Sequence, residues 1–559
     1  MSDTTVDLLV IGSGTGLAAA LSAREQGLDV LVVEKTEYVG GSTARSGGAF
    51  WIPANPALTA AGSTDTLERG ETYLEAVVGD SAPKARWQAF LEHGPETISM
   101  LQRTTGLKLM WARGYSDYHP ELPGGDAEGR SIESRPFNAS VLGKSRKLLR
   151  PGVVEAPVPM PVTGADYKWM NLVARVPRRG VPLIMRRAAQ GIGGKLIGRH
   201  YLAGGQALAA GLFAGALRAG IPIWRETSLV ELVTEGDRVV GAVVERNGAR
   251  ETVLARKGVV LAAGGFDHDM DMRHRYQAEF LQEWSLGNTG NTGDAIKLAA
   301  GLGADLDLMD QTWWFPAVAP LPGGSPQVLL AERSLPGSII VDGSGRRFIN
   351  ESTDYMTFGQ TVLAKDRAGT PVGDMWLLFD QAYRNSYVLA GSLFPRMAIP
   401  QEWYDAGIAH KASSAAALAA ATGLPEAELT ATLTRFNALA ASGIDDDFGR
   451  GKSAYDRYYG DPTVSPNPNL RPLDSGDLYA VKVVLSDLGT CGGIKSDELG
   501  RPLRADGTPI EGLYAIGNTA ANVFGRSYPG AGATIGQGLV FGHIVARHAA
   551  GAKAAAGVA

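Results

Sequence analysis

The N-terminal part of the chain alternates short apolar runs with a segment of helical composition. Residues 6–11 (VDLLVI) are almost continuously apolar, residues 17–27 have helical composition and end at a glycine, and residues 30–33 (VLVV) are apolar again. Short apolar runs bounded by turn residues are typical of buried strands in a parallel sheet. The pattern predicts a strand, a helix and a second strand at the start of a doubly wound parallel sheet.

Further strand-like runs lie far along the chain, at residues 239–245, 258–263 and 513–516. The intervening segment 303–477 differs in composition, with tryptophan, tyrosine and proline in place of alternating apolar strands and glycine turns. We therefore expect a discontinuous domain, formed by residues 1–302 and 478–559. Residues 303–477 are expected to form an inserted substrate domain.

Length and composition narrow the class of protein. The 559 residues exceed what one hydrophobic core usually supports. The net charge of −5 and the lack of a basic stripe with interleaved aromatic residues give no reason to expect a nucleic-acid partner. The chain has no apolar run of about 18 residues, and its start, MSDTTVD, lacks the features of a signal peptide. We expect a cytoplasmic protein that is at most peripheral on the inner face of the cell membrane.

Residues 168–199 differ from the rest of the chain because they carry eight positive charges and no negative ones. Within the expected excursion 150–202, a helical wheel downstream of Pro182 separates an apolar side from Arg186, Arg187 and Gln190. The apolar side holds Ile184, Met185, Ala188, Ala189, Ile192 and Leu196. A basic amphipathic helix of this kind can lie on an anionic membrane. A solvated excursion with one face packed on the domain explains the pattern equally well.

The glycines of the first turn, GSGTGL, predict a dinucleotide site. Gly12 permits a tight turn between strand and helix, and Gly14, after Ser13, lets backbone N–H groups approach a pyrophosphate. The third glycine, Gly16, comes one residue earlier than in the usual G-x-G-x-x-G pattern. In a turn shortened by one residue, Gly16 would allow the helix to pack closely on the strand.

An acidic residue follows the second strand at the spacing expected for a ribose contact. Glu34 lies 20 residues after Gly14 and precedes Lys35, and both are candidates for cofactor binding. A carboxylate at this point favours an unphosphorylated ribose, as in NAD or FAD. Taken alone, the motif also fits a glycine-rich turn followed by a surface acid.

Four other clusters favour FAD over a nicotinamide. GGSTARSGG, at residues 40–48, is a long loop rich in backbone and hydroxyl donors, although an ordinary Gly/Ser linker would look similar. VVLAAGGF (259–266), NTGDAIKLA (291–299) and GLYAIGN (512–518) add turns and helix starts with small residues. The candidate FAD-binding residues in these clusters are Gly41, Ser42, Thr43, Arg45, Ser46, Gly47, Gly48, Ala263, Gly264, Asp294, Gly517 and Asn518. No histidine follows the GGST loop, so we expect noncovalent FAD.

Several longer motifs carry a family resemblance. They are GGSTARSGG, GYSDYHPE (114–121), DQTWWFP (310–316), RRFINESTDY (346–355), SAYDRYYGDP (453–462), DLGTCGG (487–493) and SYPGAGATIGQG (527–538). With them the chain resembles, over almost its full length, the 3-ketosteroid Δ1-dehydrogenases of the fumarate reductase/succinate dehydrogenase flavoprotein superfamily. The resemblance implies a discontinuous Rossmann-like FAD-binding domain with an inserted α+β catalytic domain. It also implies FAD-dependent 1,2-desaturation of 3-ketosteroids, with Gly532 and Ile535 beside the flavin.

A desaturation next to a ketone requires that the carbonyl be polarised and that an α-proton be removed. The resemblance assigns the Tyr528 hydroxyl and the Gly532 amide to the C3 ketone and Tyr355 to the C2 proton, with Tyr118 as its hydrogen-bonded partner. Two donors on the ketone oxygen would act as an oxyanion hole. Because an unperturbed phenol has a pKa of about 10, the base needs a neighbour that stabilises its ionised form.

Other residues have less defined roles. Trp313, Trp314 and Phe315 are candidates for the apolar wall of a steroid pocket, although simple core packing is at least as plausible. The eight histidines and the single Cys491 lack metal-ligand spacing, so no metal site is expected. An external electron acceptor, a quinone or another compound, is implied but not identified.

The sequence leaves rival functions open. These are a ketosteroid desaturase acting at another A-ring bond, a fumarate-reductase-like ene reductase, and a flavin-loaded redox module on a membrane surface. The ene reductase would need arginine and histidine groups to hold carboxylates, whereas the motifs supply phenols. Two departures from the family pattern, the shortened first turn and the AGATIGQG segment, leave the steroid range open.

Overall fold

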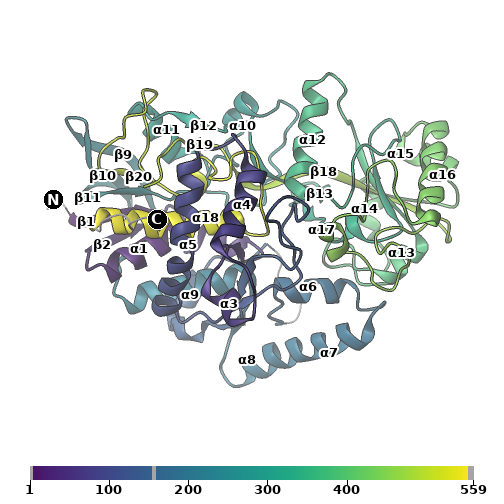
Figure 1. Cartoon of the computed structure of the whole chain (residues 1–559), viewed down its shortest axis with the longest axis horizontal. Coiled ribbons are helices and arrows are strands. Elements are labelled where there is room, and N and C mark those ends of the chain that lie inside the picture. Colours follow the sequence, from purple (N-terminus) through teal and green to yellow (C-terminus); the bar gives the residue numbers. More distant parts are fainter. Residues whose placement is uncertain (1–3, 154–158, 552–559) are drawn as a thin grey trace.

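A computed structural model describes residues 4–153 and 159–551. Two large sheets lie along the long axis of the molecule (Figure 1). The first has seven strands in the order β8-β2-β1-β11-β10-β9, with β20 paired to β11. Its strands are β1 (Thr4–Ile11), β2 (Val30–Val33), β8 (Ile223–Trp224), β9 (Thr227–Glu235), β10 (Arg238–Arg246), β11 (Ala249–Leu261) and β20 (Leu513–Ala515).

The central strands of the first sheet confirm the predicted nucleotide-binding topology. β1 runs parallel to β2 and β11, and β20 joins β11 in parallel from the far end of the sequence. Helix α1 (Gly16–Glu25) connects β1 to β2. Strands β2 and β20 are buried throughout, as are residues 8–11 of β1 and 258–261 of β11, which explains why these segments appear as continuous apolar runs. The domain is therefore discontinuous, as the sequence predicted.

Helices from both ends of the chain cover this sheet. The C-terminal helix α18 (Ala533–Ala549) packs against α1, and a Cβ on Gly542 would lie only 3.0 Å from the backbone nitrogen of Ala19. The purple and yellow helices lie side by side in Figure 1. Other helices around this region are α2 (Gly41–Arg45), α3 (Pro56–Ala60), α4 (Leu67–Val78), α5 (Lys84–Thr105), α9 (Gly204–Arg218), α10 (Met270–Tyr276) and α11 (Asp294–Gly301).

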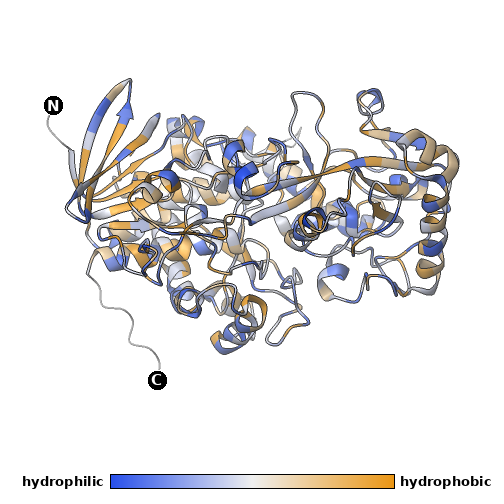
Figure 2. Ribbon diagram, turned by 90° about the horizontal axis from the view of Figure 1, so that it is seen from above, coloured by the Kyte–Doolittle hydropathy of each residue, from blue (hydrophilic) through white to orange (hydrophobic). Residues whose placement is uncertain are grey.

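The second large sheet is antiparallel and has the order β14-β13-β18-β16-β15, with β17 paired to β18. Its strands are β13 (Thr312–Val318), β14 (Gln327–Val328), β15 (Ser338–Val341), β16 (Met375–Asp380), β17 (Ala409–Ala412) and β18 (Leu478–Thr490). Because β18 lies inside this sheet, the sheet extends past residue 477, where we expected the inserted domain to end. Figure 2 shows the mixture of apolar and polar residues along the strands.

Helices and short sheets complete the molecule. Around the second sheet lie α12 (Tyr355–Arg367), α13 (Gln381–Ser386), α14 (Gln401–Asp405), α15 (Ala415–Thr422), α16 (Glu426–Ser442), α17 (Ala454–Tyr458) and the 3-10 turn η3 (Glu332–Ser334). The smaller sheets are β3-β5-β4 (Ala49–Trp51, Ser131–Ser134, Leu109–Trp111), β12-β19 (Leu306–Asp307, Gly493–Ile494) and β6-β7 (Phe137–Asn138, Tyr201–Leu202). The 3-10 turn η4 (Gly517–Thr519) precedes α18.

The expected basic excursion forms its own group of helices at the lower edge of Figure 1. They are α6 (Gly164–Asn171), α7 (Pro177–Ala188), the π-helix η2 (Ala189–Gly193) and α8 (Gly194–Leu196), and the 3-10 segment η1 (Ala139–Leu148) precedes the excursion. Proline at the first position of α7 suits a helix start, where its missing N–H has no partner to lose. Part of the predicted excursion, residues 154–158, lies outside the described residues.

The predicted orientation of this helix was wrong at one residue. Arg187, which we placed on the polar side, is buried, and its Nε donates to Asp166 Oδ2 at 2.7 Å. Met185 and Leu196 on the apolar side are instead 66% and 83% exposed. The ion pair with Asp166 accounts for the burial of Arg187, because a buried arginine requires a partner. None of the helices in residues 4–153 and 159–551 is long and apolar enough to cross a membrane.

Candidate active site

The shortened first turn has the geometry that a dinucleotide turn requires. Gly12 has a φ of 109°, and a Cβ on it would lie 2.2 Å from the carbonyl oxygen of Ala262. At Gly16, where α1 begins, a Cβ would lie 2.9 Å from Val10 Cγ1. Gly16 therefore allows α1 to pack closely on β1, the task that the third glycine of the longer motif performs.

Glu34 and Lys35 lie at the end of β2, and their side chains contact other residues that were predicted to bind the cofactor. Glu34 accepts hydrogen bonds from the Ser13 backbone and hydroxyl at 3.1 and 2.5 Å, and from the backbone and hydroxyl of Thr36. Lys35 Nζ contacts Asp294 Oδ2 at 2.7 Å. A ribose hydroxyl at Glu34 would replace one of these hydroxyl donors, whereas Lys35 and Asp294 form a surface ion pair.

Free backbone donors show that the first turn fits a pyrophosphate. Neither the Gly14 nor the Thr15 N–H donates to an acceptor in the described part of the chain. Both point from the start of α1, a helix of ten residues whose N-terminal end favours an anion. Ser42, from the GGST loop, accepts from the backbone of Asn288 and from the side chain of Asn291, each at 3.0 Å. The donor set therefore suits FAD, and these residues fit the group.

The remaining predicted FAD residues come from four separate segments. The first segment is α2 and the residues directly after it, with Gly41, Thr43, Arg45, Ser46, Gly47 and Gly48. The second follows β11, with Ala263 and Gly264, and the third is η4, with Gly517 and Asn518. The fourth is the first turn of α18, with Ile535. Only glycine fits at position 48, because a Cβ on Gly48 would lie 2.1 Å from the backbone of Gly204. Asn518 Oδ1 accepts from Trp313 Nε1 and Thr534 Oγ1 at 3.2 and 3.3 Å. The loop after β20 is thus tied to β13.

Three predicted catalytic tyrosines meet in one buried cluster. The hydroxyls of Tyr118 and Tyr355 are 2.9 Å apart, although the residues are 237 positions apart in sequence. The Tyr118 ring stacks on that of Tyr528 with centroids 5.0 Å apart, and the centroids of Tyr355 and Tyr528 are 5.3 Å apart. All three side chains are at most 5% exposed. The structure therefore brings together the residues that the tyrosine motifs singled out.

Gly532 lies beside this cluster at the N-terminal end of α18. It has a φ of 85°, and a Cβ would lie 1.9 Å from the carbonyl oxygen of Ala49, so only glycine fits. Its N–H donates to the Tyr528 hydroxyl at 3.3 Å. Two donors, a phenol and a backbone amide at a helix N-terminus, thus converge on one point, where they can stabilise a negatively charged oxygen.

The loop that carries Tyr118 is fixed by contacts with distant segments. The Tyr118 N–H donates to the carbonyl of Pro529 at 3.0 Å, which joins the loop to the SYPGAG segment. The preceding Asp117 accepts from Trp51 Nε1 at 2.8 Å and forms a buried ion pair with Arg130. These contacts explain why the GYSDYHPE motif contains an aspartate before its tyrosine.

Tyr355 is fixed from the second sheet. It is the first residue of α12, and Asp354 caps this helix by accepting from the Thr357 N–H at 2.9 Å. Arg333 Nη1 donates to the carbonyls of Glu351 and Thr353 at 2.5 Å each and so holds the segment that leads into α12. The RRFINESTDY motif therefore combines helix capping with backbone support.

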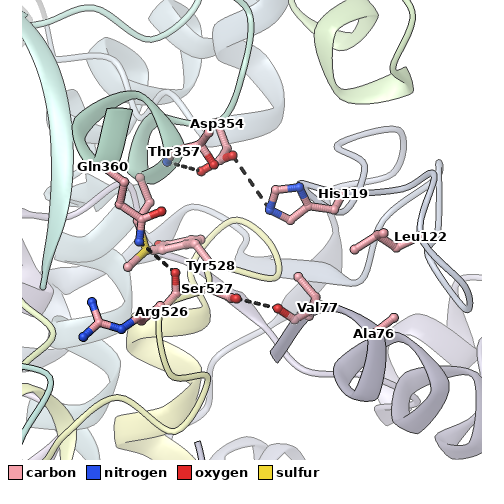
Figure 3. Close-up of a pocket in the computed structure, with 11 residues that line it drawn as sticks. Ala76, Val77, His119, Leu122, Asp354, Thr357, Gln360, Arg526, Ser527 and Tyr528 are labelled. Atoms are coloured by element: carbon pink, nitrogen blue, oxygen red, sulfur yellow. Dashed lines mark hydrogen bonds and ion pairs between the residues drawn. The ribbon is translucent and has the colours of Figure 1, made fainter. Parts of the chain in front are cut away.

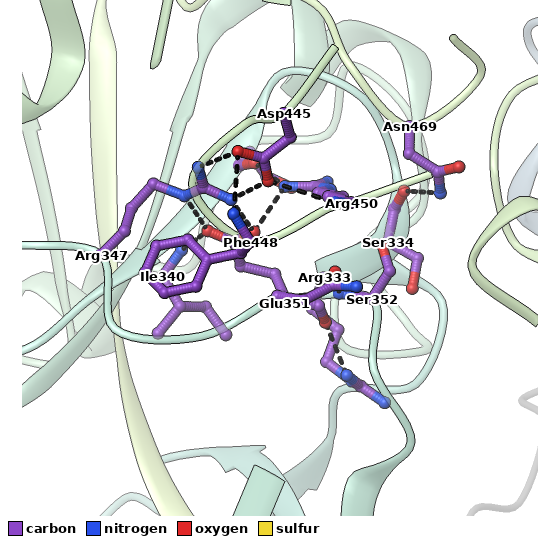
Figure 4. A network of polar contacts seen from close by, with 12 residues as sticks. Arg333, Ser334, Ile340, Arg347, Glu351, Ser352, Asp445, Phe448, Arg450 and Asn469 are labelled. Carbon is purple, nitrogen blue, oxygen red and sulfur yellow. Dashed lines mark hydrogen bonds and ion pairs between the residues drawn. The ribbon is translucent and has the colours of Figure 1, made fainter. Parts of the chain in front are cut away.

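A buried polar network extends this support into the second sheet (Figure 4). Glu351 forms ion pairs with Arg347 at 2.7 Å and with Arg450 at 3.2 Å, and Arg347 also contacts Asp445 at 2.9 Å. All four side chains are at most 4% exposed. The two arginines hold the pKa of the Glu351 carboxyl below its usual value despite burial. Charged residues thus fix the RRFINE segment inside the protein.

Burial opposes ionisation throughout the tyrosine cluster. The pKa values of Tyr118 and Tyr355 are raised well above 10, because burial disfavours the phenolate and neighbouring tyrosines add to the effect. The pKa of Tyr528 is raised as well, mainly by burial, although hydrogen bonds from Tyr355 and the Gly532 N–H counteract this. At neutral pH the three phenols are hydrogen-bond donors.

The strand β13 presents two of the three predicted wall residues to the cluster. The Phe315 ring lies 4.6 Å from that of Tyr355, and the Trp313 ring lies 4.6 Å from that of Tyr528. Trp314 points to the opposite face of the strand and packs against Gly359 of α12. The prediction for Trp314 is therefore corrected, since alternate residues of a strand face opposite sides.

Sequence reasoning missed further aromatic residues of this cluster. Tyr455 lies with its ring centroid 4.7 Å from that of Tyr118, and Tyr115 stacks on Tyr458 at 4.6 Å. Two of these tyrosines belong to the SAYDRYYGDP motif, which we used for the resemblance without assigning its side chains. The recurrence of tyrosine in several motifs was the signal that could have found them.

A small cavity lies beside Tyr528 (Figure 3). It has a volume of about 230 Å³, and Tyr528, Asp354, His119 and Gln360 are among its lining residues. His119 Nε2 lies 3.8 Å from Asp354 Oδ2, and these residues directly adjoin Tyr118 and Tyr355 in sequence. The cavity therefore borders both segments that carry the hydrogen-bonded tyrosine pair. No group of three or more potential metal ligands occurs among the residues that the structure describes.

Comparisons with known proteins agree with this geometry. A family model for an FAD binding domain matches residues 7–535. The chain is 45% identical over 566 residues to the 3-oxosteroid 1-dehydrogenase of Mycolicibacterium smegmatis, with 99% of each chain covered. It is 46% identical over 555 residues to that of Mycobacterium tuberculosis, with 97% of this chain and 98% of the relative covered.

A solved structure extends the likeness to three dimensions. The crystal structure of 3-ketosteroid Δ1-dehydrogenase from Sterolibacterium denitrificans in complex with 1,4-androstadiene-3,17-dione is 35% identical and superimposes with a TM-score of 0.92. The match covers 98% of this chain and 100% of that one.

Proposed function

Because the chain belongs to the FAD-binding family and to its 3-oxosteroid 1-dehydrogenases, we propose that it desaturates the C1–C2 bond of 3-ketosteroids. The reaction converts a 4-ene-3-one to a 1,4-diene-3-one with FAD as cofactor. The convergence of Tyr118, Tyr355, Tyr528 and Gly532 supports this assignment, since the cluster offers two donors for a ketone oxygen beside a hydrogen-bonded phenol pair.

In this proposal Tyr528 and Gly532 bind the C3 ketone. Their donors lie 3.3 Å apart, so a ketone oxygen that displaces this contact would accept from both. As the C2 proton leaves, negative charge develops on the oxygen, and the two donors and the N-terminus of α18 stabilise it. Loss of one such donor typically costs about 3 to 4 kcal/mol of transition-state stabilisation.

Tyr355 is the proposed base for the C2 proton. As a phenolate it would take the proton while the Tyr118 hydroxyl, 2.9 Å away, donates a hydrogen bond to its oxygen. A donor to the charged form lowers a pKa and so offsets part of the effect of burial. The start of α12 at Tyr355 acts in the same direction, because a helix N-terminus favours negative charge.

FAD, when bound, supplies the acceptor for the C1 hydride at its N5 atom. We propose that the Gly12–Gly16 turn and α2 hold its pyrophosphate, that Glu34 holds its adenosine ribose, and that the segments after β11 and β20 close the site. The free N–H groups of Gly14 and Thr15 support this assignment.

Anaerobic bleaching of the yellow protein tests the function. A 4-ene-3-ketosteroid should reduce the bound flavin, with one equivalent of 1,4-diene-3-one formed per flavin. A steroid without the 3-ketone serves as the control and should leave the absorbance unchanged. Bleaching by dithionite but by no steroid ketone would exclude the proposed reaction.

Two partners are proposed beyond the steroid. The first is an external electron acceptor, a quinone or another compound, which must reoxidise the flavin after each turnover.

The second is a membrane surface in contact with residues 168–199. Five of the twelve exposed large apolar side chains in the described residues lie here: Val181, Met185, Ile192, Leu196 and Ile197. Exposed cations beside them, such as Arg186 and Lys195, suit anionic lipid.

A further inference from the structure

A second cavity, far from the tyrosine cluster, opens at the outer end of the second sheet. It has a volume of about 300 Å³ and lies between α13, α14, β17 and β18, at the end of the molecule opposite α1 (Figure 1). Three of its lining residues are cationic, namely Arg384, Arg396 and Lys411, and none is acidic. Its wall also contains the phenol rings of Tyr404 and Tyr479.

Arg384 is the most unusual member because it is buried without a carboxylate partner. Its side chain is 2% exposed, and its Nη atoms donate to the backbone carbonyls of Tyr387 and Phe394. Its Nε is buried and has no acceptor among the described residues. Burial accordingly lowers the pKa of the guanidinium. Buried arginines are normally paired, so this one points to an anion that the chain itself does not supply.

Arg396 is held at the rim of the cavity in an unfavourable backbone conformation. Its φ is 68°, a value that a residue with a side chain rarely adopts, and its N–H donates to the Arg384 carbonyl at 3.1 Å. Its exposed side chain forms no ion pair within the described part of the chain. Strain of this kind persists only where surrounding contacts impose it, and it often marks a ligand site.

The other side of the cavity also presents donors. The Lys411 amine lies 5.5 Å from the centre of the Tyr479 ring and forms an exposed ion pair with Asp477 at 2.9 Å. Burial raises the pKa of the Tyr404 hydroxyl, so it remains a donor near neutral pH. The Tyr479 hydroxyl donates to Gln381 Oε1 at 2.5 Å, which leaves that amide oxygen occupied. Donors thus outnumber available acceptors around the cavity.

From this arrangement we propose a binding site for a small organic anion, one that carries a phosphate or carboxylate group. The group would lie between the side chains of Arg384 and Arg396 and accept further hydrogen bonds from Lys411 and Tyr404. Guanidinium groups bind both kinds of oxyanion. The cavity has room for a ligand larger than inorganic phosphate, since a water occupies roughly 30 Å³. Occupation would fix the segment from Tyr387 to Ile399 against α13.

Thermal unfolding of the holoenzyme tests this site. Inorganic phosphate and succinate are titrated at saturating FAD, with ionic strength held constant by sodium chloride. We expect a saturable rise of the melting temperature with at least one of the two anions, and their comparison identifies the preferred group. No rise beyond that caused by chloride would overturn the proposal.

Variants locate the effect. R396Q, at the exposed rim, should weaken the anion affinity at least tenfold, and Tyr404→Phe should weaken it about threefold. R435Q serves as the control, because Arg435 is an exposed arginine of α16 that pairs with Asp447. All three should oxidise steroid at the wild-type rate, since the cavity is remote from the tyrosine cluster. Wild-type anion affinity in both R396Q and Tyr404→Phe would overturn the assignment.

Discussion

Tyr355 and Tyr528 differ in the task proposed for their hydroxyl groups, and removal of each should give a different defect. Tyr355→Phe removes the base and should lower kcat about 10²- to 10⁴-fold. Tyr528→Phe removes one ketone donor and should lower kcat/KM about 10²- to 10³-fold. Steady-state assays with an artificial electron acceptor measure both effects.

A matched control separates chemistry from the loss of a buried hydroxyl. Tyr514→Phe removes a tyrosine hydroxyl that contacts His548 at 2.8 Å, outside the cluster. This control should keep the wild-type rate, and all three variants should keep their flavin absorbance. Near wild-type turnover in Tyr355→Phe and Tyr528→Phe would show that the cluster is not the reaction site.

The raised pKa values of the cluster determine the expected pH dependence. Because burial raises the pKa of Tyr355 above 10, only a small fraction is ionised at neutral pH, and this fraction rises with pH. If the phenolate is the active form, kcat/KM should rise about tenfold per pH unit through the neutral range and level off only at alkaline pH. A plateau reached below pH 7 would contradict a tyrosine base. Enzyme returned from each pH to neutral buffer provides the stability control.

At the scale of elements, alternation along β13 decides which aromatic residues reach the cluster. The sequence WWF places three large rings in a row, but only Trp313 and Phe315 share the face of Tyr528 and Tyr355. Trp314 supports α12 from the other face. Its replacement should therefore lower stability more than it changes the steroid preference.

The helix α7 and its neighbours form the element proposed to contact membrane. Replacement of Arg178, Arg179 and Arg186 by glutamine should weaken binding to anionic vesicles by about 3 kcal/mol, or roughly a hundredfold, at about 1 kcal/mol per charge. Co-sedimentation with phosphatidylserine-containing vesicles measures this. Arg187 is left in place because its ion pair with Asp166 fixes the helix.

The matched control for this experiment carries three equivalent replacements on the strands β10 and β11. Arg238, Arg250 and Lys257 are exposed there, and their replacement by glutamine should leave vesicle binding unchanged. If the two triple variants bind alike, the basic stretch is simply a solvated surface. Steroid turnover in solution should be normal in both.

At the scale of the whole molecule, the proposed FAD site joins segments from both ends of the chain. FAD should therefore raise the melting temperature, and at a hundredfold excess over its Kd it would add about 2.7 kcal/mol to the free energy of unfolding. Gly12→Ala should abolish this rise, because its Cβ would lie 2.2 Å from the Ala262 carbonyl. Calorimetry of apoprotein with added FAD measures the effect.

Gly27→Ala is the appropriate control for that variant. Gly27 also has a positive φ, 84°, but a Cβ there would meet no atom within 4 Å. The variant shares the backbone strain without the steric conflict, so it should lose some stability yet still respond to FAD. An equal response to FAD in both variants would argue against the Gly12 turn as part of the site.

Sequence patterns predicted the first sheet well because buried parallel strands are continuous apolar runs and their turns need glycine. They placed the end of the inserted domain too early, because β18 is as apolar as a strand of the first sheet and only its pairing shows where it belongs. The wheel of α7 failed at Arg187 because a single buried partner, Asp166, outweighs the periodicity. The candidate catalytic tyrosines came from family motifs, whereas their mutual contacts depend on long-range packing.

The hydrogen bond between Tyr118 and Tyr355 joins a loop of the flavin-binding part to the first residue of a helix on the second sheet. The two hydroxyl oxygens of this hydrogen bond therefore belong to different parts of the molecule. In the proposed mechanism turnover therefore requires the two parts to be aligned, and a protein in which only the second sheet has unfolded would lose activity while it still binds flavin. In a stored sample, partial unfolding of this kind would therefore appear first as a loss of turnover and only later as a loss of bound flavin.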